Sequence, residues 1–160
     1  MSIVSIRIAT MQDYDAICRL LSIVDAHHVN ILPGYFKPFP APPRTREVVA
    51  SFIEHENADY IVAEDDKKIV GFINIIKGSH PTASMFKKHD FAMIENLVVD
   101  EQYRNHGIAS SLFEEAEKWT KARGLKFIQL TVWAANSVAT EFYKKRGFRP
   151  LTIKQELELD

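Results

Sequence analysis

The chain has 160 residues, a length typical of one globular domain, so a single domain over residues 1–160 is expected. Hydrophobic residues make up 46% of the chain and charged residues 26%, which supplies a sizeable core and excludes intrinsic disorder. The chain has 20 Lys and Arg and 21 Asp and Glu, which gives a formal net charge of −1. This balance argues against the strongly basic surface that non-specific nucleic-acid binding needs.

Cysteine usage and hydropathy indicate the compartment. Cys18 is the single cysteine, so no internal disulfide can form and a reducing, cytoplasmic environment is expected. The first seven residues lack a basic region followed by a long apolar stretch. No segment approaches the roughly 20 apolar residues that cross a bilayer, so no membrane association is expected.

The N-terminal residues predict a strand followed directly by a helix. Apolar and polar side chains alternate over residues 3–9, which is typical of a strand with one buried face. Thr10 is suited to cap the following helix, because its hydroxyl can accept hydrogen bonds from exposed backbone NH groups. Apolar residues then recur at helical spacing, so the helix is expected to continue to His28.

A proline-rich segment separates this helix from a second one. Residues 30–44 show no periodicity and place aromatic side chains, including Tyr35 and Phe36, between prolines. Such a segment is too aromatic for a flexible linker, so an ordered loop is expected. Thr45 then predicts the start of a helix whose apolar positions recur until about Glu56.

Strand signals dominate the middle of the chain. Residues 60–63 and 69–76 are rich in β-branched side chains and flank residues 65–68, which predicts an antiparallel hairpin. The polar segment 78–89 contains a proline and is interpreted as a connection. Residues 91–99 predict the next strand.

The last third of the chain predicts two helices and two strands. One helix begins at about Gly107 and ends at Gly124, where a left-handed residue is needed. Residues 128–132 alternate as a strand, residues 137–146 predict a helix, and residues 153–159 alternate as a last strand. The order β α α β β β α β α β predicts an α/β fold, a mixed sheet with helices on its faces.

The most informative segment, residues 95–112, joins a strand to a helix through a short polar turn. A helix start presents unpaired NH groups and a partial positive charge, so this turn is suited to hold an anion such as a diphosphate. Gly107 and Ala109 leave room for close approach, and Arg104 adds a permanent cation. The segment has neither the Gly-Lys-Ser/Thr ending of a P-loop nor the glycine triplet of a dinucleotide fold.

Residues 104–109, Arg-Asn-His-Gly-Ile-Ala, resemble the acetyl-coenzyme A motif of the GCN5-related N-acetyltransferase (GNAT) superfamily, Gln/Arg-x-x-Gly-x-Gly/Ala. The rest of the family's pattern is matched, in order and spacing, by Val98-Val99-Asp100, Asn136, Phe142-Tyr143 and Gly147-Phe148. The resemblance implies the acyl-CoA N-acyltransferase fold, with a mostly antiparallel central sheet and helices on both faces. It also implies an acetyltransferase that moves the acetyl group of acetyl-CoA to a primary amine by direct attack in a ternary complex.

The resemblance further implies a coenzyme site along one strand and the turn after it. The backbone of Leu97, Val98 and Val99 would pair with the pantetheine arm, as an added strand would. This strand and the one at residues 127–133 would splay apart in a V that admits the arm. The diphosphate would be held by the amides of Arg104, Asn105, His106, Gly107, Ile108, Ala109 and Ser110, and Asn136 and Tyr143 would contact the coenzyme from the last helix.

Two side chains are the catalytic candidates under this resemblance. Glu95 matches the general base of the spermidine/spermine-type members, and Tyr143 matches the general acid that donates to the departing sulfur. A strand amide near Val98 would stabilise the oxyanion. The structural alternatives are that Glu95 is an exposed strand residue, on the face of Met93 and Leu97 by simple alternation, and that Tyr143 only packs its ring.

The acceptor is an unidentified small-molecule or peptide amine. His28, Tyr35 and Phe36 are candidate acceptor-binding residues, because they lie in the first helix and the loop after it, which the coenzyme motif does not constrain. Glu95 is a further candidate, as the base that would meet the acceptor amine. His27 and His28 have no further ligand at metal-binding spacing, so no metal is expected. The final alternating segment offers an edge for a homodimer. A coenzyme-binding regulatory module without turnover, a hydroxyl acceptor and a longer acyl donor are the alternatives.

Overall fold

A computed structural model describes residues 4–81 and 85–159. The elements in chain order are β1 (Ser5–Ile8), α1 (Tyr14–Ile31), α2 (Arg46–Ile53), β2 (Ala58–Asp65), β3 (Lys68–Ser79), β4 (Asp90–Val99), α3 (Ile108–Ala122), β5 (Ile128–Leu130) and α4 (Ser137–Lys145). Two short 3-10 helices, Met11–Asp13 and Glu101–Tyr103, precede α1 and follow β4.

The strands form one mixed sheet in the order β1-β2-β3-β4-β5. Successive strands from β1 to β4 pair antiparallel, and β5 pairs parallel with β4. Asp66 and Lys67 form the turn between β2 and β3 with φ angles of 44° and 66°, the left-handed conformation that a two-residue hairpin turn requires. The predicted hairpin and the mostly antiparallel sheet are therefore confirmed.

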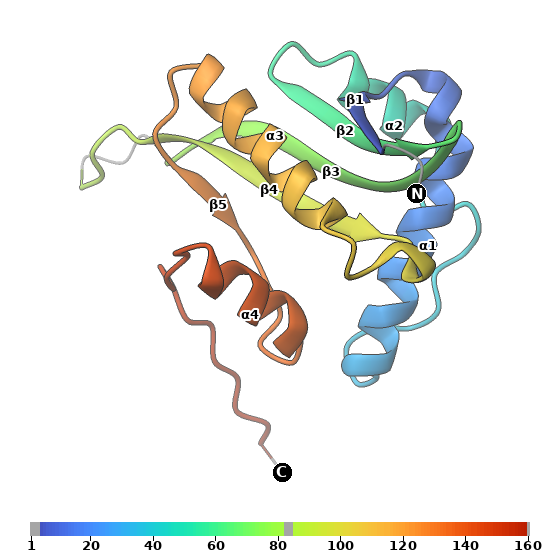
Figure 1. The fold of residues 1–160 in the computed structure, drawn as a ribbon. Helices are drawn as coiled ribbons and strands as arrows, with labels where there is room; N and C mark the ends of the chain where they lie inside the picture. Colours follow the sequence, from blue (N-terminus) through green and yellow to red (C-terminus); the bar gives the residue numbers. More distant parts are fainter. Residues whose placement is uncertain (1–3, 82–84, 160) are drawn as a thin grey trace.

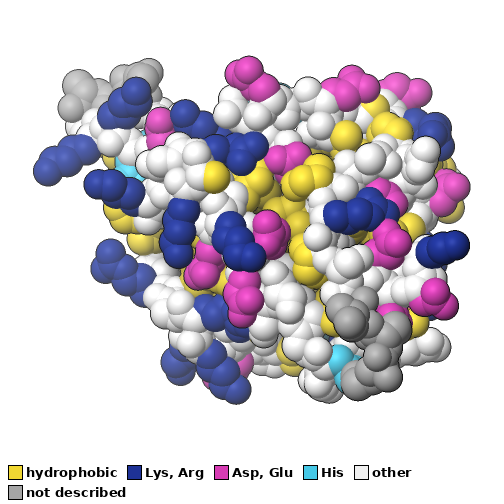
Figure 2. All heavy atoms as spheres, turned by 45° about the horizontal axis from the view of Figure 1, so that its top comes forward, with side chains coloured by type: hydrophobic (Ala, Val, Ile, Leu, Met, Phe, Trp, Pro, Cys, Tyr) yellow, Lys and Arg dark blue, Asp and Glu magenta, His cyan; other side chains and the backbone are white. Residues whose placement is uncertain are grey.

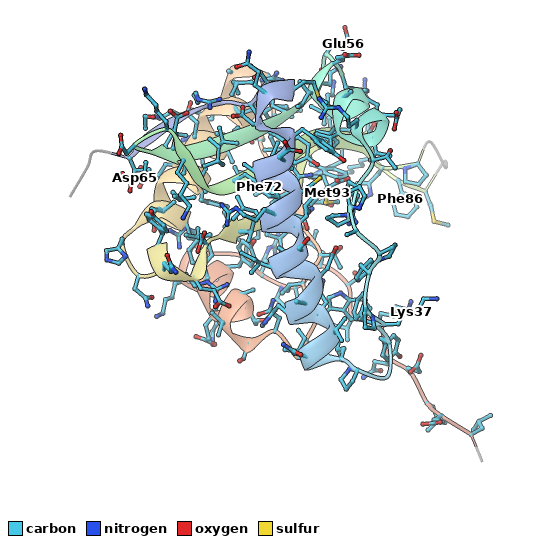
Figure 3. All side chains as sticks on the ribbon, turned by 90° about the vertical axis from the view of Figure 1, so that its right-hand side faces the viewer. Lys37, Glu56, Asp65, Phe72, Phe86 and Met93 are labelled. Atoms are coloured by element: carbon cyan, nitrogen blue, oxygen red, sulfur yellow. The ribbon has the colours of Figure 1, made fainter. Side chains whose placement is uncertain are left out.

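Helices cover both faces of the sheet, as predicted (Figure 1). One core layer joins the sheet to α1 and α2, and Figure 3 shows Phe72 and Met93 behind α1 on that face. The other layer packs α3 against the opposite face through Leu112, Phe113 and Ala116. Each layer buries apolar side chains from both partners, and this burial is the main term that stabilises the arrangement.

A β-bulge at Glu95 changes the side-chain alternation along β4. Ile75 of β3 pairs with Ile94 and Asn74 pairs with Asn96, so Glu95 is an extra residue on β4. Leu97 consequently packs in the same core layer as Ile94, the layer against α3. The expectation from simple alternation, that Glu95 shares a face with Leu97, is wrong, because the extra residue shifts the period-two pattern by one position.

Pairing between β4 and β5 ends after three residue pairs. Ala92 pairs with Ile128 and Ile94 with Leu130, while β4 continues to Val99 without a β5 partner. β5 turns away from β4 beyond this point (Figure 1). The expected V between the two strands is present, and it opens on the segment that holds Leu97 and Val98.

The end of β4 is anchored to α1 by a buried carboxylate. Asp100 accepts a 2.7 Å hydrogen bond from Nη1 of Arg19, and Nη2 of Arg19 donates to the carbonyl of Ile69 at 2.7 Å. The same carboxylate accepts from the backbone of Gln102 and caps the 3-10 helix that follows. These contacts fix the turn between β4 and α3 relative to the rest of the sheet.

Several predicted boundaries need correction. The last strand, predicted at 153–159, is wrong: these residues form no strand and are exposed, because no neighbouring strand in the described chain pairs with them. β5 ends at Leu130 rather than at Val132, and α1 continues beyond His28 to Ile31. Residue 3, the predicted first residue of β1, lies outside the described residues.

Charged side chains of both signs share the surface. On the face seen in Figure 2, acidic side chains lie among the basic ones. No α-helix in the described ranges is long and apolar enough to span a membrane.

Candidate active site

The start of α3 forms an anion cradle, defined here as the backbone from Arg104 to Ser110. Gly107 is the N-cap residue, with a left-handed φ of 80°, and it offers no side chain to cap the helix. Asn105, two residues earlier, also has a positive φ of 64°. No side chain of the N-cap residue therefore accepts hydrogen bonds from the first NH groups of α3. These NH groups remain available to an anion, which is the arrangement that binds phosphate groups.

The space beside Gly107 is open. A Cβ atom built on Gly107 would meet nothing within 4 Å. The glycine is thus required by its left-handed backbone and not by contact with a neighbouring segment. This open space is where an anion can approach the helix start.

Two arginines bring positive charge to the cradle. Arg104 donates from Nε to the carbonyl of Val99 at 3.2 Å, and its half-exposed guanidinium lies 3.8 Å from the Glu101 carboxylate. Arg146, at the end of α4, donates to Oγ of Ser110 at 2.5 Å. Sequence reasoning predicted Arg104 and missed Arg146, because only the packing of α4 against α3 brings that residue to the cradle.

The ring of Phe142 holds Arg146 in place. The guanidinium carbon of Arg146 lies 3.7 Å from the centre of that ring, a cation–π contact. The pair places a permanent cation beside the first turn of α3, where it adds to the partial positive charge of the helix start.

The expected pantetheine strand is the part of β4 that extends beyond its pairing with β5. Leu97, Val98 and Val99 pair with β3 on one side only. A peptide-like ligand can hydrogen-bond to such a strand edge, as an added strand does. The carbonyl of Val99 already accepts from Arg104, so this contact fixes the corner between the strand and the cradle.

Glu95 projects from the bulge toward the face that α1 covers. Its Oε2 accepts a 3.2 Å hydrogen bond from Nδ2 of Asn74, a residue of β3 that is 1% exposed. Asn74 follows Phe72 at strand spacing, and Phe72 packs in the core layer of α1. The carboxylate is solvent-accessible and held by one buried amide, which suits a group that exchanges protons with a bound molecule.

Tyr60 lies next to this carboxylate. It pairs with Asn74 across β2 and β3, and it is 5% exposed. Burial, and then the charge of Glu95, raises the pKa of Tyr60 to about 12, whereas the charge of Arg44 acts in the opposite direction. The Tyr60 side chain is therefore within electrostatic reach of both Glu95 and Arg44. Sequence reasoning missed Tyr60 and Asn74, because their pattern is that of ordinary strand residues.

Tyr143 lies in α4 and packs against the core layer of α3. Its ring is 5.4 Å from the ring of Phe148 and 5.3 Å from that of Phe142. Burial raises the pKa of Tyr143 to about 12, so the phenol keeps its proton at neutral pH. It can act as a hydrogen-bond donor and is a weak acid.

Asn136 is the N-cap residue of α4. Its Oδ1 accepts a 3.2 Å hydrogen bond from the backbone NH of Ala139. This contact explains the asparagine structurally, because asparagine is among the preferred N-cap residues. Its side chain is thus positioned at the helix start on the β5 side of the V.

Three of the predicted acceptor residues lie in an aromatic cluster, which we define as His28, Tyr35, Phe36 and Trp133, whereas Glu95 contacts Asn74 instead. The His28 ring stacks on Phe36 with a centroid distance of 5.2 Å, and Trp133 lies 5.3 Å from Phe36 and 5.7 Å from Tyr35. Burial lowers the pKa of His28, so its imidazole is neutral at pH 7. The hydroxyl of Tyr35 donates to Glu156.

The cluster joins three separate parts of the chain. His28 comes from α1, Tyr35 and Phe36 from the following loop, and Trp133 from the segment after β5. It thereby connects the α1 side of the molecule to the far side of the V. Trp133 was missed from the sequence, since nothing local links it to Phe36. Within residues 4–81 and 85–159, no three His, Cys, Asp or Glu side chains come together as a metal site.

A family model described as the Acetyltransferase (GNAT) family matches residues 28–148. The match includes the bulge, the cradle and the whole of α4. A solved structure, that of a tetramutant of the BH1408 protein from Bacillus halodurans, is similar with a TM-score of 0.90 and 29% identity, covering 97% of this chain and 99% of that chain.

Two of the relatives found by sequence comparison are named as N-acetyltransferases. The L-amino acid N-acetyltransferase AaaT of Escherichia coli (strain K12) is 30% identical over 152 residues, which are 92% of this chain and 84% of AaaT. The uncharacterized N-acetyltransferase MJ1207 of Methanocaldococcus jannaschii is 31% identical over 96 residues, 60% of this chain. The match covers only 41% of the length of MJ1207.

Proposed function

Because the chain belongs to the acetyltransferase (GNAT) family, we propose that it transfers the acetyl group of acetyl-CoA to a primary amine by direct attack in a ternary complex. The observation that carries the proposal is the uncapped, left-handed start of α3 at Gly107, placed directly after the part of β4 that lacks a β5 partner. A diphosphate held at Gly107 would leave the attached arm lying along Leu97 and Val98.

The residues present fit acetyl-CoA. The cradle offers NH groups and two arginines to the phosphates, and the open edge of β4 offers hydrogen-bonding groups to the amide-containing arm. When bound, acetyl-CoA supplies an acetyl group activated as a thioester. A backbone NH of β4 near Val98 would stabilise the negative charge that develops on the acetyl oxygen.

Glu95 would remove the proton from the incoming amine. An amine with a pKa of about 10.4 is protonated at pH 7, and removing that proton costs about 4 to 5 kcal/mol. The Glu95 carboxylate lies on the β4 bulge, beside the strand edge that would present the thioester. It would take the proton directly or through a water molecule, and the neutral amine would then attack.

The function is tested by measuring two quantities with the whole chain. Titration calorimetry with acetyl-CoA should give a saturable heat of binding, and thiol release should depend on an added amine. The amine panel should include L-amino acids, because the relative AaaT bears that activity in its name. Saturable binding without turnover by any amine would favour the regulatory module, and absence of binding would contradict the proposal altogether.

Tyr143→Phe is expected to lower kcat by about tenfold and to leave the affinity for acetyl-CoA unchanged. Partial burial raises the pKa of the Tyr143 phenol to about 12, so the phenol keeps its proton and can support the departing sulfur by a hydrogen bond throughout the neutral and mildly alkaline range. One neutral hydrogen bond of about 1.4 kcal/mol corresponds to this tenfold change. Steady-state kinetics with calorimetry measure both quantities, and a lost affinity with unchanged kcat would overturn the acid role.

We also propose that the segment after α4 joins two copies of the chain. Leu151, Ile153, Leu157 and Leu159 are between 64% and 81% exposed, an unusual run of apolar side chains for a solvated tail. β5 lies at the edge of the described sheet and is available as a strand partner. Sedimentation should show a dimer that is lost when the chain is shortened after residue 150; a monomer at all concentrations would contradict this proposal.

The single domain and the cytoplasmic location stay predictions from the sequence.

A further inference from the structure

One oxygen of a buried carboxylate on α1 lacks a hydrogen-bond partner. Asp25 is 6% exposed, and its Oδ2 accepts no hydrogen bond from any residue that the structure describes. The nearest cation is Nη1 of Arg44, at 3.8 Å, which is beyond hydrogen-bond distance. That nitrogen donates instead to the carbonyl of Pro43 at 2.6 Å.

Asp25 lines a cavity of about 280 Å³ between α1 and the proline-rich loop. Ser22 and Val29 contribute from α1, and Phe39, Pro40 and Pro43 contribute from the loop. Most of this lining is apolar, so the carboxylate is the charged group of the cavity wall. The shape and chemistry suit an aliphatic stem that ends in a hydrogen-bond donor.

The cavity adjoins the proposed acceptor site on two sides. Phe39 of the cavity wall lies 6.4 Å, between ring centres, from Phe36 of the aromatic cluster. On the other side, Asp25 faces Arg44, and the charges of Arg44 and Glu95 both act on Tyr60. Asp25 belongs to α1, and Glu95 projects toward the sheet face that α1 covers, so the two carboxylates lie on the same face of the sheet.

We propose that Asp25 forms a subsite for a second cationic nitrogen of the acceptor, separate from the nitrogen that receives the acetyl group. The acceptor is then a compound with two amino groups, or an amino and a guanidinium group, joined by an aliphatic stem. This inference rests on the proposed acetyl transfer. The non-reacting ammonium donates to the Asp25 carboxylate, and the stem packs against Phe39 and the prolines.

A second observation agrees with this subsite. Burial raises the pKa of Asp25, and the nearby charge of Arg44 offsets this effect only in part. A ligand ammonium at the carboxylate would supply the missing hydrogen bond and a further positive charge. Arg44 already donates to Pro43 and remains at ion-pair distance, so it need not be displaced.

The test compares α,ω-diamines of two to six carbons with the monoamines of the same length, at saturating acetyl-CoA. For the wild-type chain, the KM of at least one diamine should be about 10- to 100-fold lower than the KM of its matched monoamine. This ratio corresponds to the free energy of one charge-assisted hydrogen bond. Asp25→Asn should abolish this difference by raising the KM for the diamine. Asp15→Asn, which removes an exposed carboxylate from the same helix, should preserve it.

A measurement without catalysis separates this inference from the proposed function. The preferred diamine should raise the Tm of the wild-type chain in the absence of coenzyme, and it should not raise the Tm of Asp25→Asn. Val29→Phe, which narrows the cavity and leaves the carboxylate in place, should also remove the shift. If Tm rises in this way but no amine is acetylated, the subsite stands and the proposed function fails. Equal KM values for diamines and monoamines, with no Tm shift, would overturn the subsite.

Discussion

Replacing Gly107 by valine is expected to weaken acetyl-CoA binding by at least about 100-fold, the equivalent of losing one or two charge-assisted hydrogen bonds. Gly107 has a φ of 80°, a conformation that a β-branched residue adopts only under strain. The valine side chain would also enter the open space beside the helix start, where the diphosphate is expected. Titration calorimetry with acetyl-CoA measures the loss directly.

Gly124→Val is the matched control for this variant. Gly124 follows the other end of α3 and has a φ of 68°, and a Cβ atom at this position would likewise meet nothing within 4 Å. The control should therefore lose a similar amount of stability by backbone strain, about 1 to 2 kcal/mol, and keep its affinity for acetyl-CoA. A folded Gly107→Val protein with normal affinity would show that the cradle is not the phosphate site.

Replacing Glu95 by glutamine is expected to lower kcat by about 100- to 1,000-fold, within the range that general base catalysis contributes. The glutamine side chain has the same shape and can still hydrogen-bond to the amide of Asn74, so folding and coenzyme affinity should not change. Steady-state kinetics with the best amine of the panel, together with calorimetry, separate the effect on turnover from any effect on binding.

The pH profile distinguishes a base from a structural residue at this position. As pH rises toward the pKa of the amine, more of the acceptor is already neutral, so the deficit of Glu95→Gln should become smaller. Glu114→Gln, an isosteric change at an exposed position of α3, should leave kcat unchanged at every pH. A deficit of constant size across the profile would rule out proton removal as the role of Glu95.

Local sequence signals predicted most of the secondary structure because those signals act within a few residues. Thr45 caps α2 as expected, and Asp66 and Lys67 form the expected hairpin turn. Thr10 caps the short 3-10 helix Met11–Asp13 that precedes α1, and not α1 itself. Gly107 takes the left-handed conformation at the start of α3. Each of these features is decided by backbone geometry and by hydrogen bonds between near neighbours in the chain.

Contacts between distant segments decided what the sequence could not. The predicted strand at 153–159 is wrong. A segment with alternating apolar and polar residues forms a strand only when a neighbouring strand pairs with it, and residues 153–159 have no such neighbour in the described chain. The bulge at Glu95 arises from register with β3, so alternation along β4 alone wrongly grouped Glu95 with Leu97, which follows the bulge.

The sequence by itself determined the order of elements from β1 to α4, the strand–turn–helix at Gly107 and the family resemblance, because these depend on residue types at short, fixed spacing. Only the tertiary structure decided which side chains meet: Arg146 with Ser110, Trp133 with Phe36, and Asp25 with an apolar cavity. The physical reason is that such meetings are set by how helices pack on the two sheet faces. Helix packing depends on the volumes and the burial of side chains throughout the chain, and it produces no periodic pattern in the sequence.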